Sequence, residues 1–453
     1  MKTNKKLLAT GVLAASLFAG QAWGAVSAEE AAKLGDSLTP MGAEKAGNGG
    51  EIPAWDGGLS SAPSNYQGDG IYVNPFPDDE PKFIIDQSNV DEYADKLSPG
   101  QVEMIRQYPS YRIPVYQTRR TATYPEQIQE RTRNNATAVE LVSGGNGLDN
   151  YEDATPFPIP QNGLEVIWNH ITRYRGGSVQ RNVGQVTPTE TGDFSAVKFE
   201  EELVWNRYLE DYEPGDNDNV LFYFKQAITA PARLAGNVLL VHETINQVKE
   251  PRRAWIYNAG QRRVRRAPQV AYDGPGTASD GMRTSDNLDM FNGAPDRYNW
   301  ELIGKKEMYI PYNSYKLMDR DLSYDEIIQP GHIKQDLARY ELHRVWHVRA
   351  TLKEGERHIY AQRDFYIDED SWQAAVIDHY DGRGELWRVG EAHSMQFYDQ
   401  DVPWYAVEAL YDLLSGRYLV LGLTNEESNP YNFGIERRSR DFTPAALRRS
   451  GLR

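Results

Sequence analysis

The clearest pattern along the chain is an alternation of apolar and polar residues between 342 and 396. In 342–352 the even positions are mostly apolar, with Trp346 and Val348 at the centre, whereas the odd positions carry two histidines and Arg349. A period of two is typical of a strand with one buried face. The same signal continues, between turn-forming residues, at 357–367, 372–380 and 385–396. The pattern therefore predicts an antiparallel meander with one apolar face.

Shorter segments rich in apolar and aromatic residues surround the meander and predict further strands. They lie at 222–228, 238–246, 255–257, 262–266, 308–317 and 418–423. About ten strands with short turns and few helices imply a strongly curved antiparallel sheet or an incomplete β-barrel. Such a sheet encloses an apolar interior, which side chains, a helix or a ligand must fill. We therefore expect a mainly β (α+β) fold around an apolar cavity, with a few covering helices.

The chain has two parts that differ in amino-acid composition. Residues 29–165 are rich in glycine, proline and asparagine, and they contain one clear helical stretch at 91–108. Ser98 and Pro99 are typical of a helix start, so we expect two short helices there. The sequence thus predicts an N-terminal region at 29–165 and a curved sheet domain at 166–453.

The first residues have the order of a cleaved secretion signal, in which basic residues, an uncharged run and small residues follow one another. The basic residues are Lys2, Lys5 and Lys6, the uncharged run is 7–20, and the small residues lie in 22–28. The run is too short to cross a bilayer of about 30 Å as a helix, so a permanent anchor is the weaker interpretation. Cleavage after Gly24 or after Ala28 fits the small-residue requirement. We expect residues 1–28 to be removed during export to the periplasm of a Gram-negative bacterium.

Charge and composition narrow the class of protein further. Removal of the signal takes away three lysines and no acid, so the formal net charge changes from −16 to −19, which repels nucleic acid and anionic lipid in bulk. Hydrophobic residues make up 40% of the chain and the mean hydropathy is −0.66, which suits a core but not helical membrane spans. No cysteine is present, which excludes disulfides, thiol nucleophiles and acylation on cysteine. We expect a soluble mature chain without a transmembrane segment.

Five motifs carry a resemblance to a known family. They are 38–48 (LTPMGAEKAGN), 52–58 (IPAWDGG), 163–169 (GLEVIWN), 254–257 (AWIY) and 365–370 (FYIDED). Over nearly the whole mature length, the chain resembles the proteobacterial family of unknown function DUF1329. The resemblance implies a fold like that of the Lol outer-membrane lipoprotein-sorting carriers, in which a curved antiparallel sheet wraps an apolar cavity closed by helices. It also implies transport of a hydrophobic compound beside an RND-type exporter or an outer-membrane protein, and it brings no catalytic residues.

The predicted apolar interior supplies the candidate ligand-binding residues. Four come from the concave side of the meander, and two are aromatic residues of the AWIY motif. They are Trp346, Val348, Phe365, Ile367, Trp255 and Tyr257. Burying a large apolar side chain contributes about 1.5 to 3 kcal/mol, so the meander positions should resist polar replacement.

One predicted hairpin is dense in arginine for so acidic a chain. The residues are Arg252, Arg253, Arg262, Arg263, Arg265 and Arg266. On a strand, odd and even positions of 262–266 face opposite ways, and both carry arginine, so neither side is ordinary core. Two interpretations stay open. The hairpin is either a solvated rim, or a surface whose last four arginines contact an anionic partner or ligand head group.

Motifs for catalysis, cofactors and metals are missing from the sequence. It has no nucleophile elbow, zincin helix, P-loop or dinucleotide-binding fingerprint. His343 and His347 share one side of a strand, but four residues span about 13 Å, which is too far for one metal ion. Asp216 and Asp218 fit a polar turn better than a calcium site. We therefore expect no catalytic residue, no cofactor and no metal.

These observations favour a non-enzymatic periplasmic carrier or chaperone of a hydrophobic or amphiphilic, lipid-like molecule. The alternative is a carbohydrate-binding or envelope-polysaccharide module, since 28 tyrosines and 10 tryptophans suit sugar stacking as well as a lipid cavity. An inward-facing apolar cavity would favour the carrier, and an open groove of exposed aromatic rings beside carboxylates would favour the sugar module. A hydrolase is the third candidate, and it requires a buried carboxylate pair.

Overall fold

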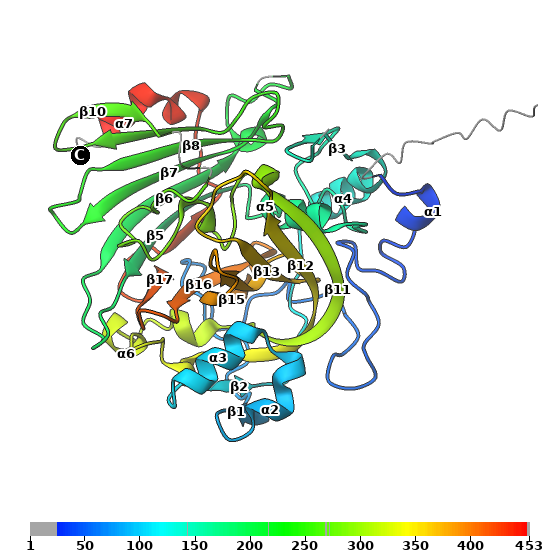
Figure 1. The fold of residues 1–453 in the computed structure, drawn as a ribbon. Helices are drawn as coiled ribbons and strands as arrows, with labels where there is room; N and C mark the ends of the chain where they lie inside the picture. Colours follow the sequence, from blue (N-terminus) through cyan, green and yellow to red (C-terminus); the bar gives the residue numbers. More distant parts are fainter. Residues whose placement is uncertain (1–24, 143, 216, 268–269, 271, 451–453) are drawn as a thin grey trace, which may run out of the picture.

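One strongly curved sheet of sixteen strands dominates the computed structural model, which describes residues 25–142, 144–215, 217–267, 270 and 272–450 (Figure 1). Nearly all neighbouring strands run antiparallel, and the outermost strands of the sheet do not pair with each other. The predicted fold class, a mainly β protein built on a curved antiparallel sheet, is confirmed. Most of the expected signal peptide, residues 1–24, lies outside the described residues.

Six strands form one half of the sheet in sequence order. They are β12 (Tyr340–Leu352), β13 (Gln362–Asp368), β14 (Ala374–Tyr380), β15 (Leu386–Phe397), β16 (Val402–Asp412) and β17 (Tyr418–Leu423). The predicted meander is therefore confirmed, except that its second strand begins at Gln362 because residues 353–361 form a loop. On the free side of β12, β11 (Tyr298–Pro311) pairs along its length, and β2 (Ile113–Val115) and β1 (Phe83–Ile85) extend this edge. The strand expected at 308–317 thus ends at Pro311, and Tyr315–Met318 forms a 3-10 turn.

The second half of the sheet comes from the middle of the chain. It consists of β5 (Ser178–Val186), β6 (Val197–Trp205), β7 (Val220–Ala230), β8 (Val238–Thr244), β9 (Arg253–Asn258) and β10 (Arg263–Arg266). The pairing of Val420 in β17 with Val186 in β5 joins the two halves into one sheet. β18 (Tyr431–Phe433) also pairs with β5, and β10 forms the far edge. A separate pair, β3 (Glu140–Leu141) and β4 (Leu148–Asp149), lies outside this sheet.

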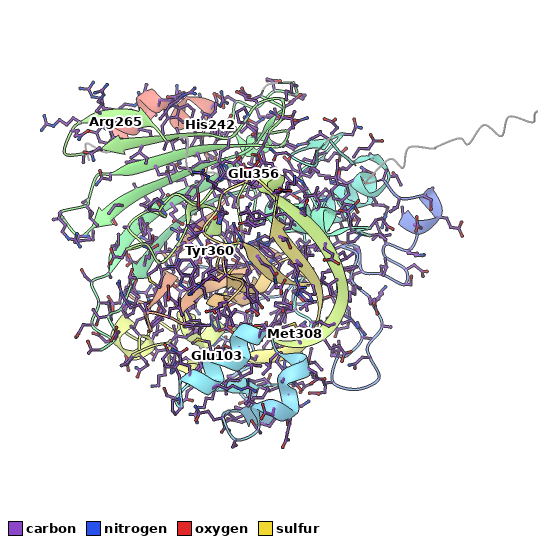
Figure 2. All side chains as sticks on the ribbon, viewed as in Figure 1. Glu103, His242, Arg265, Met308, Glu356 and Tyr360 are labelled. Atoms are coloured by element: carbon purple, nitrogen blue, oxygen red, sulfur yellow. The ribbon has the colours of Figure 1, made fainter. Side chains whose placement is uncertain are left out.

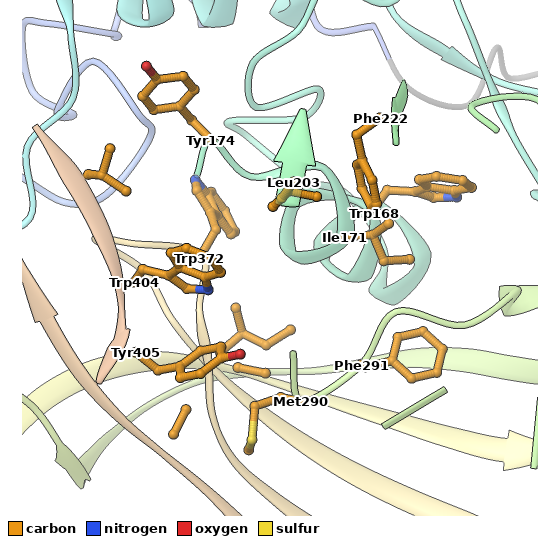
Figure 3. Packing of buried hydrophobic residues seen from close by; sticks show 14 of the residues in the cluster. Trp168, Ile171, Tyr174, Leu203, Phe222, Met290, Phe291, Trp372, Trp404 and Tyr405 are labelled. Carbon is orange, nitrogen blue, oxygen red and sulfur yellow. The ribbon is translucent and has the colours of Figure 1, made fainter. Parts of the chain in front are cut away.

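The concave face of the sheet is packed around the helix α5 (Gly163–Thr172), which lies against β11 and β12. Asn162 caps this helix, since its side chain accepts a hydrogen bond from the Glu165 backbone. Trp168 and Ile171 of α5 share one buried cluster with residues from both halves of the sheet, among them Leu203 and Trp404 (Figure 3). Residues from both halves can meet in this way only on the inner side of the curve. The helix therefore fills much of the interior that the sequence predicts.

The convex face is covered by short helices of the N-terminal region. α2 (Val90–Tyr93) leads into a 3-10 turn at Ala94–Lys96, and α3 (Pro99–Gln107) then packs on β14 and β15. Ser98 and Gln101 form a capping box at the start of α3, so the expected division into two short helices is confirmed. The Ser98 hydroxyl also donates to the buried Asp378 carboxylate at 2.9 Å, which ties this helix to the sheet.

The remaining helices lie at the margins. They are α1 (Ala28–Ala31), α4 (Glu126–Ala138), α6 (Tyr324–Ile327) and α7 (Pro444–Ser450). α7 packs on the convex side of β8, β9 and β10, where Leu447 and Phe442 cover Tyr257. Within the described ranges, no helix has both the length and the apolar character that crossing a membrane requires.

Candidate ligand-binding site

A pocket opens on the concave face of β5 to β9, beside β16. Its walls are mostly apolar, and they include Val179, Leu203, Phe222, Phe224, Leu239, Val241, Ile256, Leu288 and Trp404. The pocket has a volume of about 950 Å³ when its open mouth is counted, and only a small part of this space is wide enough for the centre of a water molecule. A narrow space of this kind suits an unbranched chain better than a ring system.

The strand register arranges the pocket lining in rows that run across the sheet. Val179, Leu203, Phe224 and Val241 lie opposite one another in pairs and form an apolar row. A second row lies two residues farther along the strands than the first row. It consists of Arg181, Glu201, Gln226, Leu239 and Ile256. Because side chains on one face recur at every second position, each strand contributes one residue to each row. The pocket therefore has an apolar side and a side that begins with charged groups.

The charged row is held together by direct hydrogen bonds. The Arg181 Nε donates to the Glu201 carboxylate at 2.5 Å, and its Nη2 donates to the Tyr405 hydroxyl at 2.8 Å. Gln226 donates to the other Glu201 oxygen at 2.6 Å. The Arg181 guanidinium also lies 4.6 Å from the centre of the Trp404 ring, which is a favourable cation–π distance. Positive charge at this end is thus paired and fixed in position.

A second charged cluster centres on Asp289. Arg173 and Arg175 both donate to the Asp289 carboxylate, and Trp404 Nε1 donates to it at 3.2 Å. Burial alone would raise the pKa of Asp289, but the two guanidinium groups hold it well below its usual range. Burial lowers the pKa of Arg175 to about 10, so the arginine stays charged at neutral pH. Two positive charges therefore face one negative charge.

The loop at 272–294 covers the pocket and contributes Arg283 to its lining. Arg283 is 3% exposed, and its Nε has no hydrogen-bond partner. In the part of the chain that the structure describes, no carboxylate forms an ion pair with it. Burial lowers the pKa of Arg283, and Glu408 opposes this shift only when its carboxyl is ionised. Burial, followed by the negative charge of Asp289, raises the pKa of Glu408 to about 8, so Glu408 is largely neutral at pH 7.

At the far end, Arg252 ties the covering loop to the sheet. Its Nη2 lies 2.5 Å from the Glu243 carboxylate and donates to the Asn292 carbonyl at 2.6 Å. The sequence groups Arg252 with the arginines of the β9–β10 hairpin as a candidate rim residue. That interpretation is wrong for Arg252, because its side chain is buried and paired inside the protein.

The four candidate ligand-binding residues of the meander lie together on the concave face. Trp346 is opposite Ile367, and Val348 is opposite Phe365, which matches the predicted phase of the strands. Val348, Phe365 and Ile367 have no exposed surface, because they pack in the cluster that includes α5. They lie outside the lining of the pocket on β5 to β9. Their burial accounts for a role in the core, and ligand binding by them stays a prediction.

The candidates Trp255 and Tyr257 lie on the opposite side of the sheet from the pocket. Tyr257 is buried under α7, and Trp255 packs against His242 with 4.8 Å between ring centres. Between them in the sequence, Ile256 points into the pocket and is 42% exposed. The alternation of β9 thus presents its aliphatic residue to the pocket and its aromatic residues to α7.

The last four arginines of the hairpin lie on the edge of the sheet. Arg263, Arg265 and Arg266 belong to β10, and Arg262 precedes it with a left-handed backbone (φ 49°). All four are exposed, and Figure 2 shows Arg265 projecting from this edge. The ion pairs among the described residues include none of them. α7 packs beside β10 and adds the exposed pair at 448–449 to the same region.

His343 belongs to a buried cluster that spacing along one strand does not predict. It lies with Asp368 and Asp370 so that one ligand atom of each falls within 4.8 Å of the others. Each group also has a protein partner, since Asp370 pairs with Arg120 at 2.7 Å and His343 lies 3.2 Å from Glu341. The donor types could hold a metal ion, and the buried Asp368 Oδ1 has no hydrogen-bond partner. Asp216, the other metal candidate, lies outside the described residues.

Sequence reasoning missed the charged groups of the pocket, although a signal for two of them exists. In 197–205 every odd position is apolar except Glu201, and in 179–183 the same holds for Arg181. A charged residue on the apolar phase of a strand indicates a buried partner. Arg283 and Asp289 lie in a loop without periodicity, so the sequence gives no comparable signal for them.

Comparisons with known proteins agree on the family. The family model described as "Protein of unknown function (DUF1329)" matches residues 84–448. The chain is 66% identical over 455 residues to "Uncharacterized protein PA3922" of Pseudomonas aeruginosa, with 100% of both chains covered. Among solved structures, it is similar to a Vibrio parahaemolyticus domain named for outer membrane lipoprotein sorting (TM-score 0.44, 13% identity, 63% of this chain and 98% of that chain). A DUF1329 family protein from Desulfovibrio piger gives a TM-score of 0.41 at 12% identity, with 60% and 92% covered. The chain belongs to the DUF1329 family.

Proposed function

We propose that this protein is a non-enzymatic periplasmic carrier of a hydrophobic or amphiphilic molecule with one long chain. The observation that carries the proposal is the narrow pocket on the concave face, with an apolar row on one side and charged groups on the other. A ligand in such a site buries its chain against aliphatic and aromatic side chains and orients its polar end on a few fixed groups. The covering loop at 272–294 encloses the ligand from the remaining side.

The proposed location in the periplasm rests on the sequence. The basic, apolar and small-residue order of the first 28 residues is that of a secretion signal. A carrier in an aqueous compartment must shield the chain of its ligand from water, and the pocket supplies that shield.

The lining of the pocket supports binding rather than catalysis. Its two carboxylates, Glu201 and Asp289, both accept hydrogen bonds from guanidinium groups. The two guanidinium groups beside Asp289 hold its pKa well below its usual range, so Asp289 is a poor proton acceptor. The described lining residues are thus suited to holding a ligand in place.

Delivery of the ligand requires a partner. We propose an RND-type exporter or an outer-membrane protein, which the cargo chemistry favours since both handle hydrophobic compounds. The exposed arginines at 262–266 are the proposed contact, because they supply local positive charge in an acidic chain.

The alternative, a carbohydrate or envelope-polysaccharide module, would use a polar groove beside β18 that holds about 1180 Å³ when its open mouth is counted. Tyrosines and carboxylates line this groove, as sugar binding requires. However, Tyr72 and Tyr431 are each 4% exposed, and the hydroxyls of Tyr66 and Tyr72 donate to Asp399. Rings buried in this way offer little flat surface for stacking on a sugar, so the pocket on β5 to β9 carries the proposal.

The fluorescent single-chain fatty acid cis-parinaric acid tests the proposal. We expect saturable binding to the mature chain in a 1:1 ratio, and competition by single-chain amphiphiles. Ile256→Trp at the pocket mouth should weaken binding about tenfold or more, because the larger ring occupies the entrance. The matched control Ile84→Trp replaces another exposed isoleucine, 36% exposed on β1, and should leave binding unchanged. Absence of probe binding, or equal binding by both variants, contradicts the proposal.

A further inference from the structure

The charges buried around the pocket do not balance. Arg181 is paired with Glu201, and Arg252 is paired with Glu243. Arg173 and Arg175 share the single carboxylate of Asp289. Arg283 has no ion-pair partner in the described part of the chain. The region therefore carries surplus positive charge inside a protein whose formal net charge is −16.

Glu408 does not remove this surplus at neutral pH. Its buried carboxyl accepts a hydrogen bond from the Met290 backbone, and its other oxygen has no partner. Burial and the nearby Asp289 raise its pKa to about 8, so it is mostly protonated. A protonated carboxyl contributes no negative charge to Arg283.

An unpaired guanidinium in a buried position is unfavourable unless it serves a ligand. Its desolvation is costly, and proteins therefore pair such groups or place them where a ligand supplies the counter-charge. Arg283 meets the second condition because it is 3% exposed and lines the pocket. The lining residue Gly276 makes room for it, since an ideal Cβ at position 276 would lie 3.2 Å from the Arg283 Nε.

The position of Arg283 along the pocket fits an amphiphile. The charged groups that act on Arg283 include Glu201 and Arg181 of the charged row, so it lies at the polar side of the lining. The apolar row of Val179, Leu203, Phe224 and Val241 is two residues away along the strands. A ligand can thus place an anion on Arg283 and lay its chain along the apolar row.

We propose that the pocket selects a single-chain amphiphile with an oxyanion head group, a carboxylate or a phosphate monoester, and that Arg283 recognises the head group. This inference rests on the proposed carrier function and names its ligand class. The planar guanidinium matches both head groups, because it donates two parallel hydrogen bonds to either oxyanion. The narrow pocket favours a ligand with one chain over a ligand with several.

Calorimetric titration of the mature full chain tests the inference with four ligands of one chain length, used below their micellar concentrations. They are palmitate, hexadecyl phosphate, hexadecanol and hexadecyltrimethylammonium. We expect at least one of the two anions to bind about tenfold or more tightly than hexadecanol, and the cation to bind most weakly. Comparison of palmitate with hexadecyl phosphate distinguishes a carboxylate ligand from a phosphate ligand.

Variants at Arg283 separate recognition from structure. Arg283→Met should abolish the preference for the anions over hexadecanol, whereas Arg283→Lys should retain part of this preference. The control Arg265→Met removes the same charge from the exposed edge and should have no effect. Arg283→Met should also raise the melting temperature of the ligand-free protein, because it removes an unpaired buried charge.

The outcomes are distinguishable. If hexadecanol binds as tightly as the anions, or if Arg283→Met keeps the preference, the inference about the head group is overturned while the carrier proposal stands. A lowered melting temperature of Arg283→Met would show that Arg283 has a structural role and would overturn the inference as well. If none of the four ligands binds, the carrier function itself fails.

Discussion

Arg181 and Glu201 stand directly opposite each other on β5 and β6, and their side chains meet at 2.5 Å on the inner face of the sheet. Both residues are almost fully buried. Tyr405 accepts from Arg181 Nη2 and Gln226 donates to the second Glu201 oxygen, whereas the buried Arg181 Nη1 has no hydrogen-bond partner. The pair fixes the polar side of the pocket. It also explains how two charged residues are tolerated on the apolar phase of their strands.

Breaking this pair should destabilise the protein. Glu201→Gln leaves the Arg181 charge buried without its counter-charge, so we expect the free energy of unfolding to fall by about 3 kcal/mol or more. The double variant Arg181→Met with Glu201→Leu removes both charges and should recover most of the loss. Urea unfolding followed by tryptophan fluorescence measures both values. A Glu201→Gln variant as stable as the wild type would show that the pair does not hold the two strands.

Glu408 should make stability depend on pH. Its pKa is raised from 4.5 to about 8, so its contribution to stability is complete below 4.5 and is lost as the pH rises toward 8. Glu408→Gln keeps the shape without the titration. We expect the variant to be more stable than the wild type at about pH 9, by at most about 5 kcal/mol, and equally stable at about pH 4. Parallel wild-type and variant curves over this range would contradict the assignment.

The signal peptide should be cleaved after Gly24. The Val26 amide donates to the Ala136 carbonyl at 2.9 Å, and Ser27 caps α1 by accepting from the Glu30 amide at 3.1 Å. Cleavage after Ala28 would remove both contacts, whereas cleavage after Gly24 keeps them. Amino-terminal sequencing of the protein released by osmotic shock should therefore begin at Ala25. A start at Glu29 would favour the other site, and Met1 on the exported protein would end the interpretation as a signal.

The arginine edge should govern docking. Replacing Arg262, Arg263, Arg265 and Arg266 together by Ser should leave folding and probe binding intact, since all four side chains are exposed. Transfer of a fluorescent fatty acid to vesicles that contain phosphatidylglycerol should slow by about threefold or more and lose its salt dependence, because salt screens exposed charges within about 8 Å. A control replaces four exposed arginines elsewhere, namely Arg106, Arg133, Arg357 and Arg383. Unfolding of the first variant, or transfer at the wild-type rate and salt dependence, contradicts the docking role.

The sequence predicts the local structure well where one period dominates. The alternation in 342–396 yields the meander and the shared face of Trp346 and Val348, because a buried sheet face imposes a period of two. The capping signal at Ser98 likewise marks the start of α3. These features depend on neighbours in the sequence or on a single strand.

The pocket depends on contacts that no local pattern encodes. The pairing of β17 with β5 joins the two halves of the open sheet, and it links segments more than two hundred residues apart in the sequence. The GLEVIWN motif lies in α5, which fills the interior near Val348. The space that remains open therefore lies over β5 to β9. In β9 the large aromatic residues Trp255 and Tyr257 are the predicted ligand contacts. The alternation of the strand places Ile256 in the pocket and these two residues on the opposite face.

Native mass spectrometry of the mature protein, isolated gently from the periplasm of its own host, tests the central claim most directly. The account predicts one small molecule per chain, with a single long chain and an acidic head group after extraction. The cargo should be absent from Ile256→Trp and present in Ile84→Trp. Protein that carries no small molecule and takes up none of the four hexadecyl ligands, or a cargo retained equally by Ile256→Trp, would contradict it.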